Sequence, residues 1–276
     1  MAADLSRAAL ARARAARRRL KDGSRIADDA GAARFIDERG FALLMPLAGV
    51  PLPSVSEADG AAPWSEEFRC TDRAWAWKET LPGRKLCAYG KLIRHRGTFI
   101  SWRLFPAFAA VYGPAGDLAE EYEAGRLGRA ERDLAEMVAE YGPVSSHDLW
   151  RRARGLFGGR RHQFLAALDR LQAGFILTVA GGTLDGWSQH TWDLVERQAP
   201  PGVLARVPPT SAAREAILEQ TLENCVALPE AALRSILRWS PQELTAAVTA
   251  LSARGLLRKI PVEDERAPWL ALNSPL

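Results

Sequence analysis

Two groups of side chains in this chain could carry chemistry, a short polar run and several clusters of basic residues. The run Ser145-Ser146-His147-Asp148 contains the residue types of a hydrolytic nucleophile, a base and an orienting acid. Residues adjacent in sequence do not make a catalytic triad, because the three groups must converge from separate segments. A serine just before an apolar periodic segment is typical of a helix N-cap. We therefore assign Ser145 or Ser146 to capping.

The remaining reactive residue types indicate neither a metal nor a cofactor. No histidine pairs with another histidine or a cysteine at metal-ligand spacing. The loop 155–159 is rich in glycine but lacks the Lys-Ser/Thr ending of a phosphate-binding loop. The three cysteines are far apart and no Cys-x-x-Cys occurs, which favours a reducing cytoplasm. No apolar run approaches the roughly 20 residues that span a bilayer, so we expect no membrane contact.

The basic residues gather in stretches suited to phosphate. The net charge of the 276 residues is only +4, but residues 1–27 carry eight basic and two acidic side chains. A second basic stretch covers 69–103, and an acidic one covers 117–140. These stretches are either solvated surface or phosphate contacts. The candidates for DNA contact in the second stretch are Lys78, Arg84, Lys85, Lys91, Arg94 and Arg96.

A repeat in the second half predicts the elements that would position such contacts. Residues 164–177 return as 244–257, each as an amphipathic helix, a glycine and an apolar strand. This order is typical of the third helix of a winged helix-turn-helix entering its wing, a module that holds a helix in a DNA groove. The first copy exposes a basic face and the second a neutral to acidic one. The candidates for DNA contact in the first copy are Arg160, Arg161, Gln163 and Arg170.

The whole chain predicts a mainly α protein with small β wings (α+β), built from tandem winged helix-turn-helix modules. The expected divisions are a disordered or helical basic arm at 1–27 and modules at 28–115, 116–203 and 204–276. Within the first module we expect a helix over 30–39. The alternation around Trp75 and Trp77 predicts a strand, followed by a turn at 81–85. The last strand is expected to end near Val262.

Several motifs resemble those of AlkZ-related proteins, relatives of the AlkZ/YcaQ-type DNA glycosylases. They are Trp75-Ala76-Trp77-Lys78-Glu79-Thr80-Leu81-Pro82, Tyr89-Gly90-Lys91-Leu92-Ile93-Arg94, Thr98-Phe99-Ile100-Ser101, Glu121-Tyr122-Glu123-Ala124-Gly125-Arg126-Leu127 and Tyr141-Gly142-Pro143-Val144-Ser145. The resemblance covers about residues 30–262. It implies a tandem array of winged helices that cradles DNA, and in active members the excision of alkylated bases, including cross-linked ones.

The resemblance also locates the catalytic motif and shows that its chemistry is missing. Active glycosylases of this type carry Gln-apolar-Gln or Gln-apolar-Asp after the first apolar helix. The matching positions here hold Met45 and Leu47. Neither side chain can bind the attacking water or stabilise an oxocarbenium ion. Asp37 and Glu38 lie upstream and are the only carboxylates we consider as substitutes. Both are otherwise ordinary residues of a solvated helix face.

Three functions follow as hypotheses. The first is a DNA-binding protein related to AlkZ-type glycosylases, with duplex DNA as partner and catalysis lost or altered. The second is an active N-glycosylase that uses other carboxylates. The third is a non-enzymatic regulatory protein that contacts a protein partner through the third module. None of them requires a cofactor or a metal.

Overall fold

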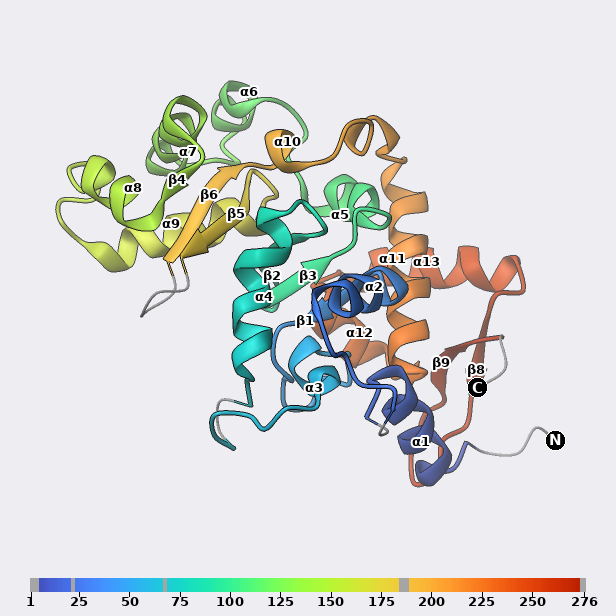
Figure 1. Ribbon diagram of the computed structural model, residues 1–276. Helices are drawn as coiled ribbons and strands as arrows, with labels where there is room; N and C mark the ends of the chain where they lie inside the picture. The colour runs from blue at the N-terminus through green and yellow to red at the C-terminus, as the bar shows by residue number, and fades with distance from the viewer. Residues whose placement is uncertain (1–4, 21–22, 67–68, 184–188, 274–276) are drawn as a thin grey trace.

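One order of six elements occurs three times in the computed structural model, which describes residues 5–20, 23–66, 69–183 and 189–273 (Figure 1). Each unit runs helix, strand, helix, helix, strand, strand, the order of a winged helix. In the first unit these are α2 (Asp29–Arg39), β1 (Phe41–Leu43), α3 (Val55–Asp59), α4 (Asp72–Gly83), β2 (Ala88–Ile93) and β3 (Arg96–Ile100).

The other two units repeat this order after short connecting helices. The second contains α7 (Arg129–Tyr141), β4 (Val144–Ser145), α8 (Ser146–Ala153), α9 (Arg161–Ala173), β5 (Leu177–Thr183) and β6 (Gln189–Leu194). The third contains α11 (Thr210–Cys225), β7 (Ala227–Leu228), α12 (Glu230–Leu237), α13 (Pro241–Ala253), β8 (Leu257–Ile260) and β9 (Trp269–Leu272). The connecting helices are α5 (Phe105–Tyr112), α6 (Leu118–Glu123), α10 (Val195–Gln198) and the short 3-10 helix η1 (Leu204–Arg206).

Each unit closes on a three-stranded antiparallel sheet of the same topology. The orders are β1-β3-β2, β4-β6-β5 and β7-β9-β8, so the short first strand always pairs with the last strand of the hairpin. The expected fold class, mainly α with small β wings, is confirmed. The third hairpin runs beyond Val262, the end that we predicted, because Leu257 pairs with Leu272 on β9.

The strand predicted around Trp75 and Trp77 is wrong, since these residues lie in α4. Thr71 caps this helix by accepting a hydrogen bond from the amide of Ala74. Ala74, Trp77, Lys78 and Leu81 are buried at the i, i+3, i+4, i+7 spacing of a helix. The alternating tryptophans therefore point to different sides of a helix. The helix also continues through Pro82 to Gly83, where we expected a turn.

Residues 7–17 of the basic arm form a docked helix, α1 (Arg7–Arg17), rather than a disordered segment. Ser6 caps it, and Leu10 is buried with only 2% of its surface exposed. The Arg14 guanidinium donates to the carbonyls of Cys225 and Ala227, and Leu5 forms a parallel bridge with Val262. Helix α1 lies beside the third unit near the C-terminus (Figure 1). Burial explains the order, because the few apolar residues of the arm meet an apolar partner.

The three units share hydrophobic cores instead of having one each. A first cluster joins Phe35 and Trp77 of the first unit to Phe164 and Trp192 of the second. A second cluster joins Phe41 and the helix α5 to α11 and α13 of the third unit. The first unit is therefore packed against both of the others. Among the described residues, no helix is long and apolar enough to cross a membrane.

Candidate nucleic-acid interface

The positions where the resemblance predicts the catalytic motif hold packed apolar side chains. Met45 is half-buried and packs against the first core cluster, while Leu47 packs against the second. The segment is a tight loop in which the amide of Val50 donates to the carbonyl of Leu47 at 3.0 Å. These side chains hold the loop to the protein and offer no group that could orient water.

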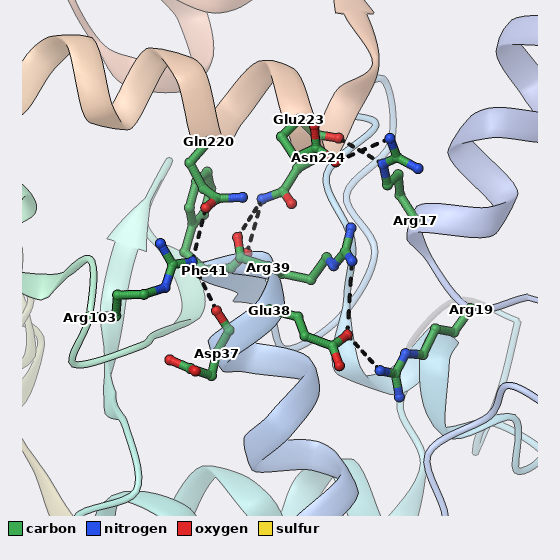
Figure 2. A network of polar contacts seen from close by, with 10 residues as sticks. All are labelled: Arg17, Arg19, Asp37, Glu38, Arg39, Phe41, Arg103, Gln220, Glu223 and Asn224. Carbon is green, nitrogen blue, oxygen red and sulfur yellow. Dashed lines mark hydrogen bonds and ion pairs between the residues drawn. The ribbon is translucent and has the colours of Figure 1, made fainter. Parts of the chain in front are cut away.

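The two carboxylates considered as substitutes lie at the end of α2, in the contact region shown in Figure 2. Glu38 accepts a hydrogen bond from Arg19 at 2.6 Å and lies 3.9 Å from Arg39. Two guanidinium groups therefore compensate its charge. The backbone carbonyl of Asp37 accepts a hydrogen bond from Arg103 at 3.0 Å, and its carboxylate points away from this network. Within the described segments, no hydrogen bond or ion pair joins either carboxylate to a second carboxylate or to a histidine.

The same region is where α11 of the third unit docks on the first unit. The buried amide of Asn224 donates to the carbonyl of Arg39 at 2.9 Å and to that of Phe41 at 3.4 Å. Gln220 accepts from Arg103 at 3.1 Å. Burial lowers the pKa of Arg39 from its usual value. These contacts satisfy backbone groups at a helix end, which is a structural role.

The third helix of each unit is the one that enters DNA in a winged helix, and the first unit's copy is covered. Strand β5 of the second unit lies across α4. A Cβ added to Gly83 would stand 3.3 Å from the Cα of Gly181. On the same interface, buried Glu79 lies 2.7 Å from the Lys78 ammonium and 3.0 Å from Nδ1 of His190 on β6. Helix α4 therefore joins two units.

This burial corrects the prediction for Lys78. Its side chain is 4% exposed, and its ammonium also lies 4.2 Å from the ring centre of Trp75. An ammonium held in this way cannot reach a phosphate while the two units stay together. The sequence placed Lys78 in a basic stretch, but the helical period turns it inward.

The third helix of the second unit, α9, is exposed and basic at its N-terminal end. Arg160, Arg161 and Gln163 are exposed, as are Arg151, Arg152 and Arg154 on or just after the preceding helix α8. Leu165, an apolar residue of the same helix, is also 47% exposed. The opposite face packs inward through Phe164, Ala167, Leu168 and Leu171. In α13, the exposed polar side chains are instead Gln242, Thr245, Thr249 and Ser252.

The basic residues predicted to contact DNA fall into two groups, and those of the first group already interact with other groups of the protein. Arg84 pairs with Asp29 at 2.9 Å, Lys91 with Asp169 at 2.9 Å, and Arg170 with Glu131. The ammonium of Lys85 donates to the carbonyl of Arg197 at 2.8 Å. These side chains would have to leave a partner to bind phosphate.

Four of the predicted arginines have no such partner. In the part of the chain that the structure describes, Arg94, Arg96, Arg160 and Arg161 make no ion pair with a carboxylate. The Arg160 guanidinium donates to Gln163 at 3.1 Å, and the Arg161 guanidinium lies 6.0 Å from the ring centre of Trp150. Arg94 and Arg96 stand exposed at the turn between β2 and β3.

One basic residue that sequence reasoning missed is Arg238, which directly follows α12. Its guanidinium lies 3.2 Å from Nε2 of His95, beside the turn that carries Arg94 and Arg96. The residue has a left-handed backbone with φ of 58°. Nothing in the local sequence signals this approach, because residues 95 and 238 belong to different units. No group of three or more His, Cys, Asp or Glu residues that could hold a metal occurs among the described residues.

The fold and this surface define the class of protein: three winged-helix units around shared cores, with one exposed basic third helix. A sequence model of the AlkZ-related family matches residues 26–238. The chain therefore belongs to the AlkZ-related family.

The structure is similar to that of the DNA glycosylase AlkZ from Streptomyces sahachiroi. The TM-score is 0.58 at 13% sequence identity, over 96% of this chain and 69% of that chain. At this identity the likeness shows a common fold. No curated protein matches the chain.

Proposed function

We propose that this chain binds duplex DNA in a DNA-repair role and does not use the family's catalytic motif. The observation that carries the proposal is the contrast among the three third helices: α4 is covered by the second unit, α13 exposes uncharged side chains, and α9 is exposed and basic at its start. Unpaired arginines at the start of such a helix suit phosphates and the edges of bases. Membership in the AlkZ-related family and the AlkZ-like fold support DNA as the partner.

Replacing Arg160 and Arg161 together by glutamine should weaken duplex binding by about tenfold or more at moderate salt. Each lost phosphate contact should also lower the slope of log affinity against log salt by about 1. Fluorescence anisotropy with a labelled duplex would measure both quantities. The matched control is Arg129→Gln with Arg206→Gln, which removes the same charge from exposed positions outside α8 and α9. Equal losses in the two double variants would contradict a specific role for α9.

The alternative of an active glycosylase predicts release of free base from alkylated DNA. We expect no release under single-turnover conditions with excess protein, since Met45 and Leu47 are apolar and Glu38 is paired with arginines. Chromatography of the reaction products would detect the base. Release that is abolished by Asp37→Asn or Glu38→Gln would establish the enzyme and overturn the proposal of a catalytically inactive binder.

A protein partner remains a second proposal for α13. Its exposed Thr245 and Thr249 lie on a face with little charge, which suits contact with protein better than contact with phosphate. A partner lost on mutation of these two threonines, with DNA affinity unchanged, would identify that role.

A further inference from the structure

A pocket of about 270 Å³ lies where the three units meet. Leu92 and Ile93 come from the first unit, Ala173 and Phe175 from the second, and Arg238 from the third. The remaining lining comes from Phe108, Tyr112, Ile236 and Leu237. The space corresponds to about nine waters at about 30 Å³ each, which is enough for one planar heterocycle.

Aromatic rings form one wall of this pocket. The rings of Tyr112 and Phe175 are nearly parallel, at 15° and with centres 6.3 Å apart, and Phe108 lies within 6.3 Å of both. Tyr112 is fixed in place because its hydroxyl donates to the carbonyl of Leu237 and accepts from the indole of Trp239. Burial raises the pKa of Tyr112, so the phenol is neutral. Tyr112 is the half-buried ring of the three, and Phe175 lines the pocket from the core. Aromatic rings suit the stacking of a nucleobase.

The backbone of Phe175, one of the rings in this wall, has a conformation that costs free energy for a bulky residue. In all three units the residue after the third helix's C-cap has a left-handed backbone: Lys85 with φ of 54°, Phe175 with 56° and Gly255 with 69°. Glycine adopts this conformation readily and a bulky side chain does not. The second unit therefore keeps a phenyl ring where the third unit has no side chain.

The rim of the pocket is cationic. Arg238 lines the pocket and contacts His95, and Arg94 and Arg96 flank that histidine on the exposed turn. Within the described segments, none of these three arginines makes an ion pair with a carboxylate. Exposed guanidinium groups without acidic partners are suited to phosphate oxygens.

We propose that this pocket and its rim bind one unstacked nucleotide, with the base against Tyr112 and Phe175 and the phosphate on Arg94, Arg96 and Arg238. An apolar aromatic pocket alone would take many ring compounds, and a cationic rim alone would take any anion. Together they select a ring joined to a phosphate. The source of the nucleotide that we favour is DNA, from which it would be extruded, and this choice rests on the proposed function. A free nucleotide has the same chemistry and would bind independently of that function.

Calorimetry on the full chain tests the site without DNA. Deoxyadenosine monophosphate should bind at least tenfold more tightly than deoxyadenosine or inorganic phosphate. Arg238→Gln should reduce nucleotide binding to about the level of deoxyadenosine. Ala173→Trp should fill the pocket and abolish nucleotide binding. The matched control is Ala253→Trp, at the equivalent and exposed position of α13. Unchanged melting temperatures would show that the variants fold.

A duplex that carries 2-aminopurine at a mismatch separates the two sources. A rise in its fluorescence on binding, lost in Ala173→Trp with duplex affinity kept within about twofold, supports a nucleotide extruded from DNA. If the nucleotide binds but the fluorescence does not rise, the pocket is supported with a free nucleotide as its ligand. If the nucleotide binds and the protein has no affinity for duplex DNA, the pocket is supported in the same way and only the proposed function fails. The inference is overturned if the monophosphate binds no better than inorganic phosphate, or if Ala173→Trp and Ala253→Trp behave alike.

Discussion

Raising the salt concentration from 50 to 200 mM should lower the affinity of this protein for duplex DNA by about 100-fold. The reason is counterion release, in which log affinity falls by about 0.9 per phosphate neutralised for each tenfold rise in salt. Four contacts, one for each of the unpaired arginines 94, 96, 160 and 161, give about that factor. If Lys91 and Arg170 also exchange their carboxylate partners for phosphates, the loss exceeds 1,000-fold.

Anisotropy titrations at four or more salt concentrations would give the slope directly. Arg160→Gln with Arg161→Gln should make the slope shallower by about 2, and Lys78→Gln should not change it, because Lys78 is buried. A flat response between 50 and 200 mM would reject duplex DNA as the partner. It would favour a protein-binding function for the winged-helix units.

Trp77→Ala should lower the free energy of unfolding by about 3–5 kcal/mol, the usual cost of truncating a buried tryptophan. Trp77 is 2% exposed within the core shared by the first and second units. Its indole also donates to Asp29 at 2.8 Å, so the substitution leaves that carboxylate without this donor. Urea denaturation followed by circular dichroism would measure the change.

Trp75→Ala is the matched comparison, two residues away in the same helix. Trp75 is only half-buried, against the edge of the core and the ring of Trp64. Its truncation should cost about 1 kcal/mol, a typical value for a partly exposed site. Positions two apart lie about 200° apart around a helix but on the same face of a strand. Equal costs at the two positions would contradict the helical assignment.

The features that were predictable from sequence are those determined by neighbouring residues. Ser240 and Glu243 form a capping box with Pro241 at the first helical turn of α13, as their order predicts. The cap of Asp28 on α2 is equally local. At α11 the local signal is misleading: Thr210 and Ser211 are typical capping residues, but Pro209 occupies the N-cap position. The strand predicted at α4 was wrong because two tryptophans can be two residues apart in a helix as easily as in a strand.

The sequence could not predict which basic residues are free to contact phosphate, because their protein partners are distant in sequence. Arg170 and Arg160 look alike in the helical pattern, yet Arg170 meets Glu131 on α7. Lys91 meets Asp169 across a unit boundary. The basic arm has the composition of a disordered segment, and only the third unit's surface gives it an apolar and hydrogen-bonding partner.

The sequence by itself determined the repeated helix and strand elements of the second and third units, the basic residues at the start of α9 and the apolar side chains of Met45 and Leu47. These depend on local pattern and residue type. The tertiary structure alone decided that the second unit covers α4, that Arg94, Arg96, Arg160 and Arg161 make no ion pair with a carboxylate among the described residues, and that a pocket lined by aromatic rings and Arg238 forms between the units. Such features depend on distances between residues up to about 150 positions apart, which no local pattern records.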